Sequence, residues 1–95
     1  MDQQSVLTAL IEVHRDIQTS LGGNTDISAE TCPLADVKGF DSVLIPTALR
    51  MAARQLGLEI GEGRNMRNLY VSSDGKRKLS LSEVATRFVT QYGSN

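Results

Sequence analysis

An all-α fold is the class that this 95-residue sequence predicts. Apolar residues recur at three- and four-residue steps in separate segments, and glycines or helix-capping residues bound those segments. Apolar content is 40% and charged content 22%, so the chain has enough apolar surface to fold. The length corresponds to one domain over residues 1–95. We expect an up-and-down bundle of three main helices, with a short irregular or hairpin insert.

The first helix is expected from about Asp2 to Leu21. One face is apolar, and its residues are Val6, Leu10, Val13 and Ile17, widened by Leu7 and Ile11. The other face is polar and holds Gln3, Gln4, Glu12, Arg15, Asp16 and Gln18. His14, the chain's one histidine, is expected on this polar side as a surface residue without a catalytic role. Gly22 and Gly23 end the helix, because glycine accepts the left-handed conformation.

Residues 24–39 are expected to form a long connection rich in Ser, Thr, Asp and Pro. Loops of this length without regular structure are uncommon in small domains and are often functional. Ile27, Leu34 and Val37 are spaced to pin this loop across a helical core. We expect Phe40 to pack beneath the helix that follows and to fix the approach to it.

The second helix is expected from about Ser42 to Leu56. Its inward residues are Leu49, Ala52, Ala53 and Leu56, and Gly57 ends it. Pro46 conflicts with a regular start, because proline suits the first helical turn but costs about 3 kcal/mol in a helix interior. Two alternatives remain open. Either the helix begins nearer Ile45 and leaves Ser42 in the loop, or its first turn is irregular.

The stretch from residue 61 to residue 80 has little helical amphipathicity. Asp74-Gly75 lies between two short runs of β-forming residues, which is a hairpin signal. A lone hairpin is only marginally stable, so it would need to pack against the helices. The last helix is expected from Ser82, as N-cap, to about Tyr92, with Glu83 in its first turn. Its inward residues are Val84 and Phe88, with Val89 as a further candidate.

Charge is unevenly distributed, although the formal net charge is only −1. Acidic residues dominate the first 36 positions, and basic residues dominate positions 64–78, so two oppositely charged faces are plausible. The single cysteine, Cys32, cannot form an internal disulfide, which fits a reducing compartment. No apolar run approaches the roughly 20 residues that span a bilayer, and no secretory signal pattern opens the chain. We therefore expect a cytoplasmic protein without membrane partners.

The candidate site is the stretch Gly39-Phe40-Asp41-Ser42-Val43. At or near a helix start, the Ser42 side chain can cap backbone N–H groups and still present its hydroxyl to solvent. The partial positive charge of a helix start also favours an attached phosphate. An Asp-Ser pair alone is most commonly a simple helix cap. The functional interpretation therefore depends on the residues around the pair.

This order of elements resembles the acyl carrier protein family, in which the serine of an Asp-Ser-Leu-type motif carries 4′-phosphopantetheine. The resemblance covers most of the chain and is strongest over residues 31–60. That block holds a Thr-x-Pro-Leu-like turn, Asp36, Gly39-Phe40-Asp41-Ser42-Val43 and an amphipathic helix closing on Leu56-Gly57-Leu58-Glu59-Ile60. Ser82-Glu83-Val84 is similar to the opening of the family's last helix.

The resemblance implies an acyl-carrier-protein-like bundle with 4′-phosphopantetheine, donated by coenzyme A, on Ser42. The Ser42 Oγ would attack the β-phosphate of coenzyme A inside a separate phosphopantetheinyl transferase, and Asp41 would contact that transferase or its metal. The arm would then hold an acyl, aminoacyl or peptidyl cargo as a thioester. The further partners implied are a loading ligase and a synthase or acyltransferase of a dedicated fatty-acid, polyketide or nonribosomal-peptide-type pathway. We expect a monomer with no metal of its own.

Three departures from the family pattern bear on the partners. The second helix carries Arg50 and Arg54 and no carboxylate, whereas the family's helix is carboxylate-rich and docks on basic partner surfaces. Pro46 replaces an ordinary helical residue near the path of the arm, and the 61–80 insert is longer and more basic than the family's short third helix. The residues expected to contact partners are Val43, Pro46, Thr47, Arg50, Arg54, Arg64 and Arg67.

Two other functions remain open on the sequence alone. A small helical nucleic-acid-binding domain would place the basic cluster from Arg64 to Lys78 on phosphates, but the acidic isoelectric point and the lack of an aromatic platform argue against it. The second alternative is a carrier-like scaffold that is never modified. An enzyme is not expected, because no set of convergent titratable residues can be assembled from the sequence.

Overall fold

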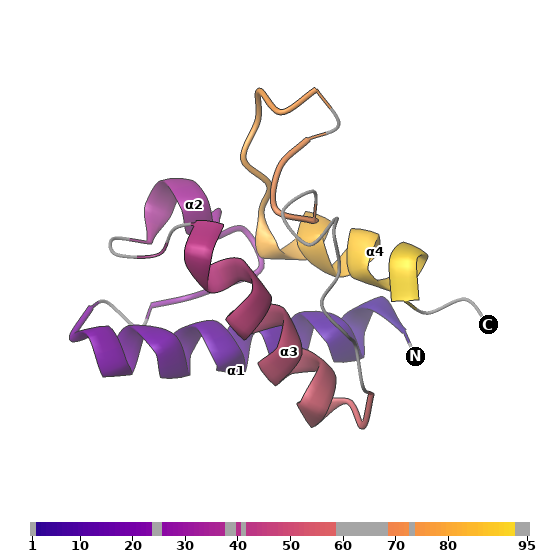
Figure 1. Cartoon of the computed structure of the whole chain (residues 1–95), viewed down its shortest axis with the longest axis horizontal. Coiled ribbons are helices and arrows are strands. Elements are labelled where there is room, and N and C mark those ends of the chain that lie inside the picture. The colour runs from indigo at the N-terminus through magenta and orange to yellow at the C-terminus, as the bar shows by residue number, and fades with distance from the viewer. Residues whose placement is uncertain are drawn as a thin grey trace.

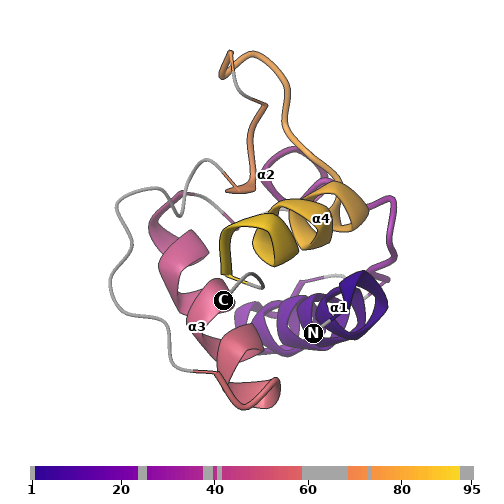
Figure 2. The same cartoon turned by 90° about the vertical axis from the view of Figure 1, so that its right-hand side faces the viewer.

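The computed structural model describes residues 2–23, 26–37, 40, 42–58, 69–72 and 74–92, and for Ser42 the backbone alone. Over these residues the protein is all-α, as predicted. The helices are α1 (Gln3–Leu21), α2 (Pro33–Asp36), α3 (Ile45–Gln55) and α4 (Leu81–Tyr92), with a 3-10 turn, η1 (Ser42–Leu44), leading into α3. Figures 1 and 2 show α3 and α4 both packed on α1, with α4 running roughly opposite to α1 and α3 crossing it obliquely. No helix in this part of the chain is long and apolar enough to cross a membrane.

The core lies where α1 meets α3 and α4. Its least exposed large apolar residues are Leu10, Ile45, Leu49, Leu79, Leu81, Val84 and Phe88. Each such side chain contributes roughly 1.5–3 kcal/mol through its removal from water. The long connection closes one side of this core, because Ile27, Val37 and Phe40 are buried and Leu34 packs against them. The prediction that this loop is pinned across the helices is confirmed.

The ends of α1 follow from their capping residues. The Ser5 N–H donates to the Asp2 carboxylate at 2.7 Å, which satisfies one of the N–H groups that a helix start leaves unpaired. This bond also holds the pKa of Asp2 below its usual value. At the other end Gly22 has φ 72° and closes the helix in the left-handed conformation. The predicted bounds of this helix are therefore confirmed.

The predicted surface positions of His14 and Gln18 were wrong. Each side chain is only 1% exposed, although both lie on the side of α1 that the pattern marks as polar. The His14 ring is covered by Phe40 and Tyr70, with ring centroids 5.0 and 5.7 Å away. Periodicity within one helix cannot reveal this burial, because the covering residues come from distant parts of the chain.

Both alternatives for the start of the second main helix are partly realised. The α-helix begins at Ile45, and the three residues before it form the 3-10 turn η1. Pro46 is then the second residue of α3, where its missing N–H has no intrahelical partner to lose. At the far end Gly57 has φ 76°, and the Leu58 N–H donates to the Ala53 carbonyl at 2.8 Å.

The predicted hairpin is present as a tight turn with one antiparallel β-bridge, between Val71 and Lys78. Gly75, at the turn, has φ 73°, as the Asp-Gly signal requires. The Leu79 N–H donates to the Tyr70 carbonyl at 2.9 Å. Tyr70 and Leu79 are both buried, so the base of the hairpin rests on the helices as expected.

The N-cap of the last helix is Ser80, two residues before the predicted Ser82. The Glu83 N–H donates to the Ser80 hydroxyl at 3.3 Å, and the Ser80 N–H donates to the Glu83 carboxylate at 3.2 Å. This reciprocal pair is a capping box, so the cap is Ser80 and Ser82 lies inside the first turn. The same bond from Ser80 holds the pKa of Glu83 below its usual value. The predicted place of Glu83 in the first turn is confirmed.

Candidate functional site

The turn that opens α3 is held between two buried side chains. Phe40 is 5% exposed just before the turn, and Ile45 is 1% exposed just after it. The Phe40 N–H also donates to the Val37 carbonyl at 3.2 Å. Between these anchors Ser42 begins η1, and its neighbour Val43 is 75% exposed. The backbone at Ser42 therefore belongs to a surface turn whose two ends are fixed by the core.

Four of the predicted partner-contacting residues share one exposed face. Val43, Thr47, Arg50 and Arg54 are all exposed and follow one another at steps of four, three and four residues along η1 and α3. Pro46 lies beside them and is half-buried. Three predicted site residues, Asp41, Arg64 and Arg67, lie outside the described residues, as does the side chain of Ser42.

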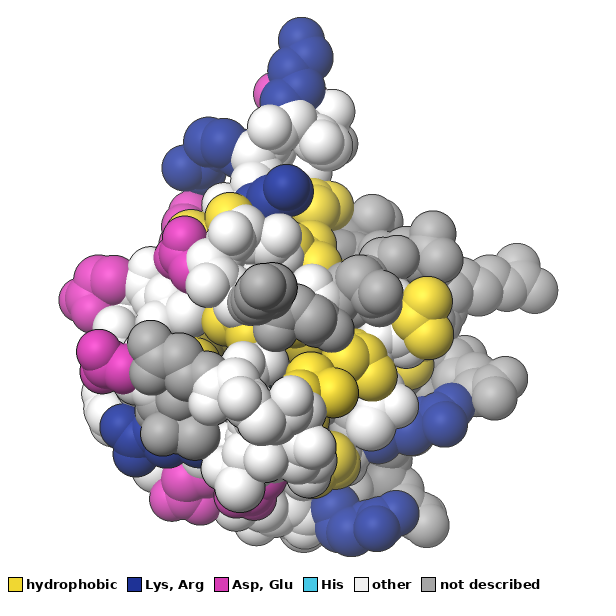
Figure 3. All heavy atoms as spheres, turned by 90° about the vertical axis from the view of Figure 1, so that its left-hand side faces the viewer, with side chains coloured by type: hydrophobic (Ala, Val, Ile, Leu, Met, Phe, Trp, Pro, Cys, Tyr) yellow, Lys and Arg dark blue, Asp and Glu magenta, His cyan; other side chains and the backbone are white. Residues whose placement is uncertain are grey.

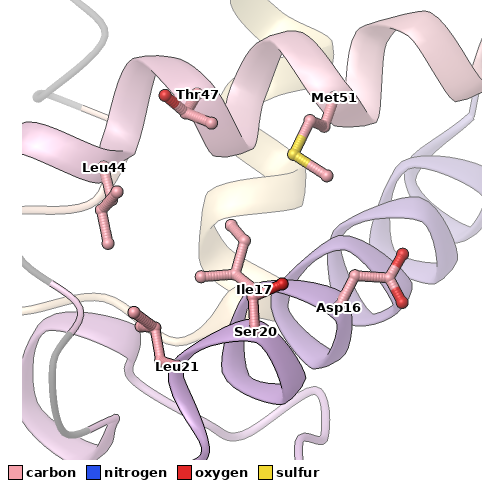
Figure 4. Close-up of a pocket in the computed structure, with 7 residues that line it drawn as sticks. All are labelled: Asp16, Ile17, Ser20, Leu21, Leu44, Thr47 and Met51. Carbon is pink, nitrogen blue, oxygen red and sulfur yellow. The ribbon is translucent and has the colours of Figure 1, made fainter.

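A groove lies along this face, between the end of α1 and the start of α3. It encloses about 300 Å³ and is lined by Asp16, Ile17, Ser20, Leu21, Leu44, Thr47 and Met51. Figure 4 shows that the side chains of Ile17, Leu21, Leu44 and Met51 point into the space between the two helices. Figure 3 shows hydrophobic side chains gathered near the middle of one face of the molecule.

The groove was not predicted from the sequence. Of its lining residues, Thr47 alone was among the predicted site residues. Two spacings could have indicated it: Ile17 and Leu21 are four residues apart on α1, and Leu44 and Met51 are seven apart at η1 and α3. Each pair therefore lies on one side of its own helix. Leu21 is 51% exposed, so it is an apolar residue that the core leaves uncovered. That the two pairs face each other follows only from the way α3 crosses α1.

Opposite charges lie on either side of the α1–α3 contact. Arg50 and Arg54 are exposed on α3, and Glu12 and Asp16 are exposed on α1. One polar bond crosses the contact, since the Gln55 side-chain amide donates to the Glu12 carboxylate at 2.8 Å. The exposed face of α3 is therefore basic, whereas Asp16 places a carboxylate on the α1 side of the groove.

A buried polar cluster lies behind the turn. One His14 nitrogen, Nδ1, is 2.7 Å from the Leu10 carbonyl and must donate to it, so Nε2 accepts from the Tyr70 hydroxyl at 3.0 Å. Burial lowers the pKa of His14 to about 4 and raises that of Tyr70. The rings of Phe40 and Tyr70 are 5.7 Å apart. The cluster therefore joins α1, the segment before Ser42 and the base of the hairpin.

This cluster and the lone cysteine are poorly suited to catalysis. Both ring nitrogens of His14 are already engaged, and the ring is buried. Burial, then the neighbouring carboxylates of Asp36 and Glu83, raises the pKa of the Cys32 thiol, which disfavours the nucleophilic thiolate. Among the described residues, no group of three or more His, Cys, Asp and Glu could hold a metal ion.

Comparison of the chain with models of known protein families, with curated proteins and with solved structures found no match. The functional interpretation therefore rests on the residue pattern around Ser42 and on the geometry of the surface between α1 and α3.

Proposed function

We propose that this protein is a carrier that holds an acyl, aminoacyl or peptidyl group as a thioester on 4′-phosphopantetheine attached to Ser42. The observation that carries the proposal is the turn at η1. Ser42 opens a surface turn that buried Phe40 and Ile45 fix at both ends, within the block that resembles the carrier family. Such a turn offers a residue to another enzyme without disturbing the core behind it.

The start of α3 suits an attached phosphate. The first N–H groups of a helix have no intrahelical partner and carry partial positive charge. The N-cap position of α3 is Leu44, whose side chain cannot accept a hydrogen bond from these groups. Pro46, the second residue of α3, has no N–H, so a phosphate on Ser42, three residues before α3, would use the donors that remain. When bound, the phosphopantetheine arm supplies the thiol to which cargo is attached.

The groove between α1 and α3 supports a partly apolar cargo. Leu44, two residues after Ser42, and Met51 form one wall, and Ile17 and Leu21 of α1 provide apolar surface across from them. Apolar groups of a cargo lying there would be removed from water at roughly 25 cal/mol per Å². The groove would therefore shield a bound group while it waits for the next enzyme.

The exposed face of η1 and α3 is the proposed contact surface for partners. The proposed partners are a phosphopantetheinyl transferase, a loading ligase and a synthase or acyltransferase of a dedicated pathway. Arg50 and Arg54 make this face basic, so partners that use it would present carboxylates. Val43, in η1, adds an exposed apolar side chain at the end of this face that precedes α3.

Mass spectrometry of the intact protein tests the proposal. After incubation with coenzyme A and a broad-specificity phosphopantetheinyl transferase, the wild-type chain should gain the mass of one phosphopantetheine group. Ser42→Ala should gain nothing. The matched control is Ser5→Ala, since Ser5 is an exposed serine on α1 and should leave the modification unchanged.

The two alternatives give different results in this experiment. A folded wild-type protein that several transferases leave unmodified would be the unmodified scaffold, and the carrier proposal would be wrong. Modification that persists in Ser42→Ala would place the attachment elsewhere. Retention of DNA or RNA that falls with salt would favour the nucleic-acid alternative.

A further inference from the structure

The hairpin that precedes α4 stands clear of the helices. Figures 1 and 2, seen from directions 90° apart, both show it projecting beyond the start of α4. Its tip carries Lys76, Arg77 and Lys78, all of them exposed. The space-filling view in Figure 3 also shows basic side chains at this projection. A charged segment of this kind can reach a partner that does not contact the groove.

The turn of this hairpin is held by its own polar groups. The Ser72 hydroxyl donates to the Asp74 carboxylate, which also accepts from the Lys76 N–H at 3.0 Å. The Arg77 N–H donates to the Ser72 hydroxyl at 3.0 Å, and the Ser72 N–H donates to the Arg77 carbonyl at 2.8 Å. These bonds fix the backbone that carries the basic side chains. Little further ordering of that backbone would therefore be needed on binding.

The base of the hairpin is fixed as firmly as its turn. Tyr70 and Leu79, one on each arm, are 0% and 2% exposed, and the Tyr70 hydroxyl is bonded to His14 of α1. The base that carries the basic segment is therefore tied to the helical core.

The three bases at the tip are not equivalent. The Arg77 guanidinium forms an ion pair with Glu83 of α4 at 3.2 Å. Lys76 and Lys78 flank Arg77 in the chain, and both are exposed. No carboxylate in the described part of the chain pairs with either lysine. Asp74 is engaged in the turn, and Glu83 is engaged by Arg77 and Ser80.

We propose that Lys76 and Lys78 form a docking surface for an acidic surface of a partner protein, separate from the Ser42 face. The lysines lack carboxylate partners among the described residues, and the backbone beneath them is fixed. Complementary charge of this kind mainly raises association rates and sets orientation. Arg77 is kept in place by Glu83 and supports the same surface as a weaker third charge.

A nucleic acid fits this surface less well than an acidic protein. Two phosphate contacts would give a salt slope of only about −1.8, against about −5 to −9 for proteins with six to ten contacts. Binding of single strands also needs exposed aromatic rings on which bases stack. The one aromatic ring on the described arms of the hairpin, that of Tyr70, is fully buried.

Binding of two fluorescent probes, measured by anisotropy at low salt, tests this inference. The probes are an oligoglutamate peptide and a DNA duplex, used with the full chain. Oligoglutamate should bind the wild type more tightly than DNA, and the double variant Lys76→Ser, Lys78→Ser should weaken its binding about fivefold. Amide chemical shifts of the wild type should change mainly at residues 74–78.

A matched control removes the same charge elsewhere. Arg15→Ser, Arg87→Ser takes one base each from α1 and α4, outside both proposed contact surfaces, and should change oligoglutamate binding by less than about twofold. An equal loss in both double variants would mean that net charge alone is responsible, and the inference would be wrong. Tighter binding of DNA that depends on Lys76 and Lys78 would overturn it in favour of a nucleic-acid partner. Neither outcome depends on the modification of Ser42.

Discussion

At the scale of single residues, His14 shows how a polar side chain can belong to the core of a small domain. A buried imidazole is costly unless both nitrogens find partners. The Leu10 carbonyl and the Tyr70 hydroxyl supply them, and Phe40 covers the ring. His14 therefore helps to define which segments meet. Replacing His14 would therefore lower the free energy of unfolding more directly than it would change any binding property.

Replacing Tyr70 by phenylalanine tests this role. Tyr70→Phe keeps the ring but removes the hydroxyl that donates to His14 Nε2, so a buried acceptor loses its partner. The free energy of unfolding should fall by about 1–3 kcal/mol, measured by urea denaturation.

The control for that substitution is Tyr92→Phe. The Tyr92 hydroxyl is also buried, but it has no hydrogen-bond partner in the described structure. Its removal should be neutral or slightly stabilising. An equal loss of stability in both variants would show that the bond between Tyr70 and His14 contributes nothing specific.

At the scale of elements, the sequence predicted the three long helices well and their first turns less well, and it missed α2 within the connection expected over residues 24–39. Amphipathic spacing and the glycines identified the three long helices and the ends of two of them. The N-cap of α4 was misassigned because Ser80 and Ser82 are both plausible caps, and only the reciprocal bond to Glu83 distinguishes them. The position of Pro46 implied an irregular helix start but could not say which kind.

Alanine substitutions at the two serines test the assignment of the α4 cap. Ser80→Ala removes one half of the capping box and should reduce stability by about 0.5–2 kcal/mol. Ser82→Ala lies within the first turn and should change stability by less than about 0.5 kcal/mol. Thermal and urea unfolding of the two variants gives the comparison. A larger effect at Ser82 would return the cap to the position that the sequence suggested.

At the scale of the whole molecule, the candidate site depends on contacts that no local pattern encodes. The motif around Ser42 could be found from sequence because its residues are consecutive. The groove could not, because its apolar walls come from two helices whose crossing is set by the core. The burial of His14 was missed for the same reason, since its cover comes from Phe40 and Tyr70.

Global stability should therefore depend on pH through His14. Its pKa is about 4 in the folded protein and 6.5 as the ordinary value, so the unfolded chain binds the proton more readily between these limits. Stability should be complete above pH 6.5 and should fall towards pH 4, by up to about 1.4 kcal/mol per pH unit. Urea unfolding at several pH values measures this slope.

A variant without the titrating group separates this effect from that of the carboxylates. His14→Phe should be less stable at neutral pH but should lose the slope between pH 6.5 and 4. The carboxylates of Asp2, Asp74 and Glu83 have lowered pKa values, so their contribution is lost at more acidic pH. An unchanged slope in His14→Phe would assign the dependence to other groups.

The bond between His14 and Tyr70 joins residues 56 positions apart. While a ribosome is making the chain, the imidazole lacks the hydroxyl that donates to its Nε2 until residue 70 has been made. The ring cluster that locks the segment before Ser42 can therefore assemble only after most of the chain has been translated. A nascent fragment that stops before the hairpin would show the motif but not the conformation that the finished protein gives it.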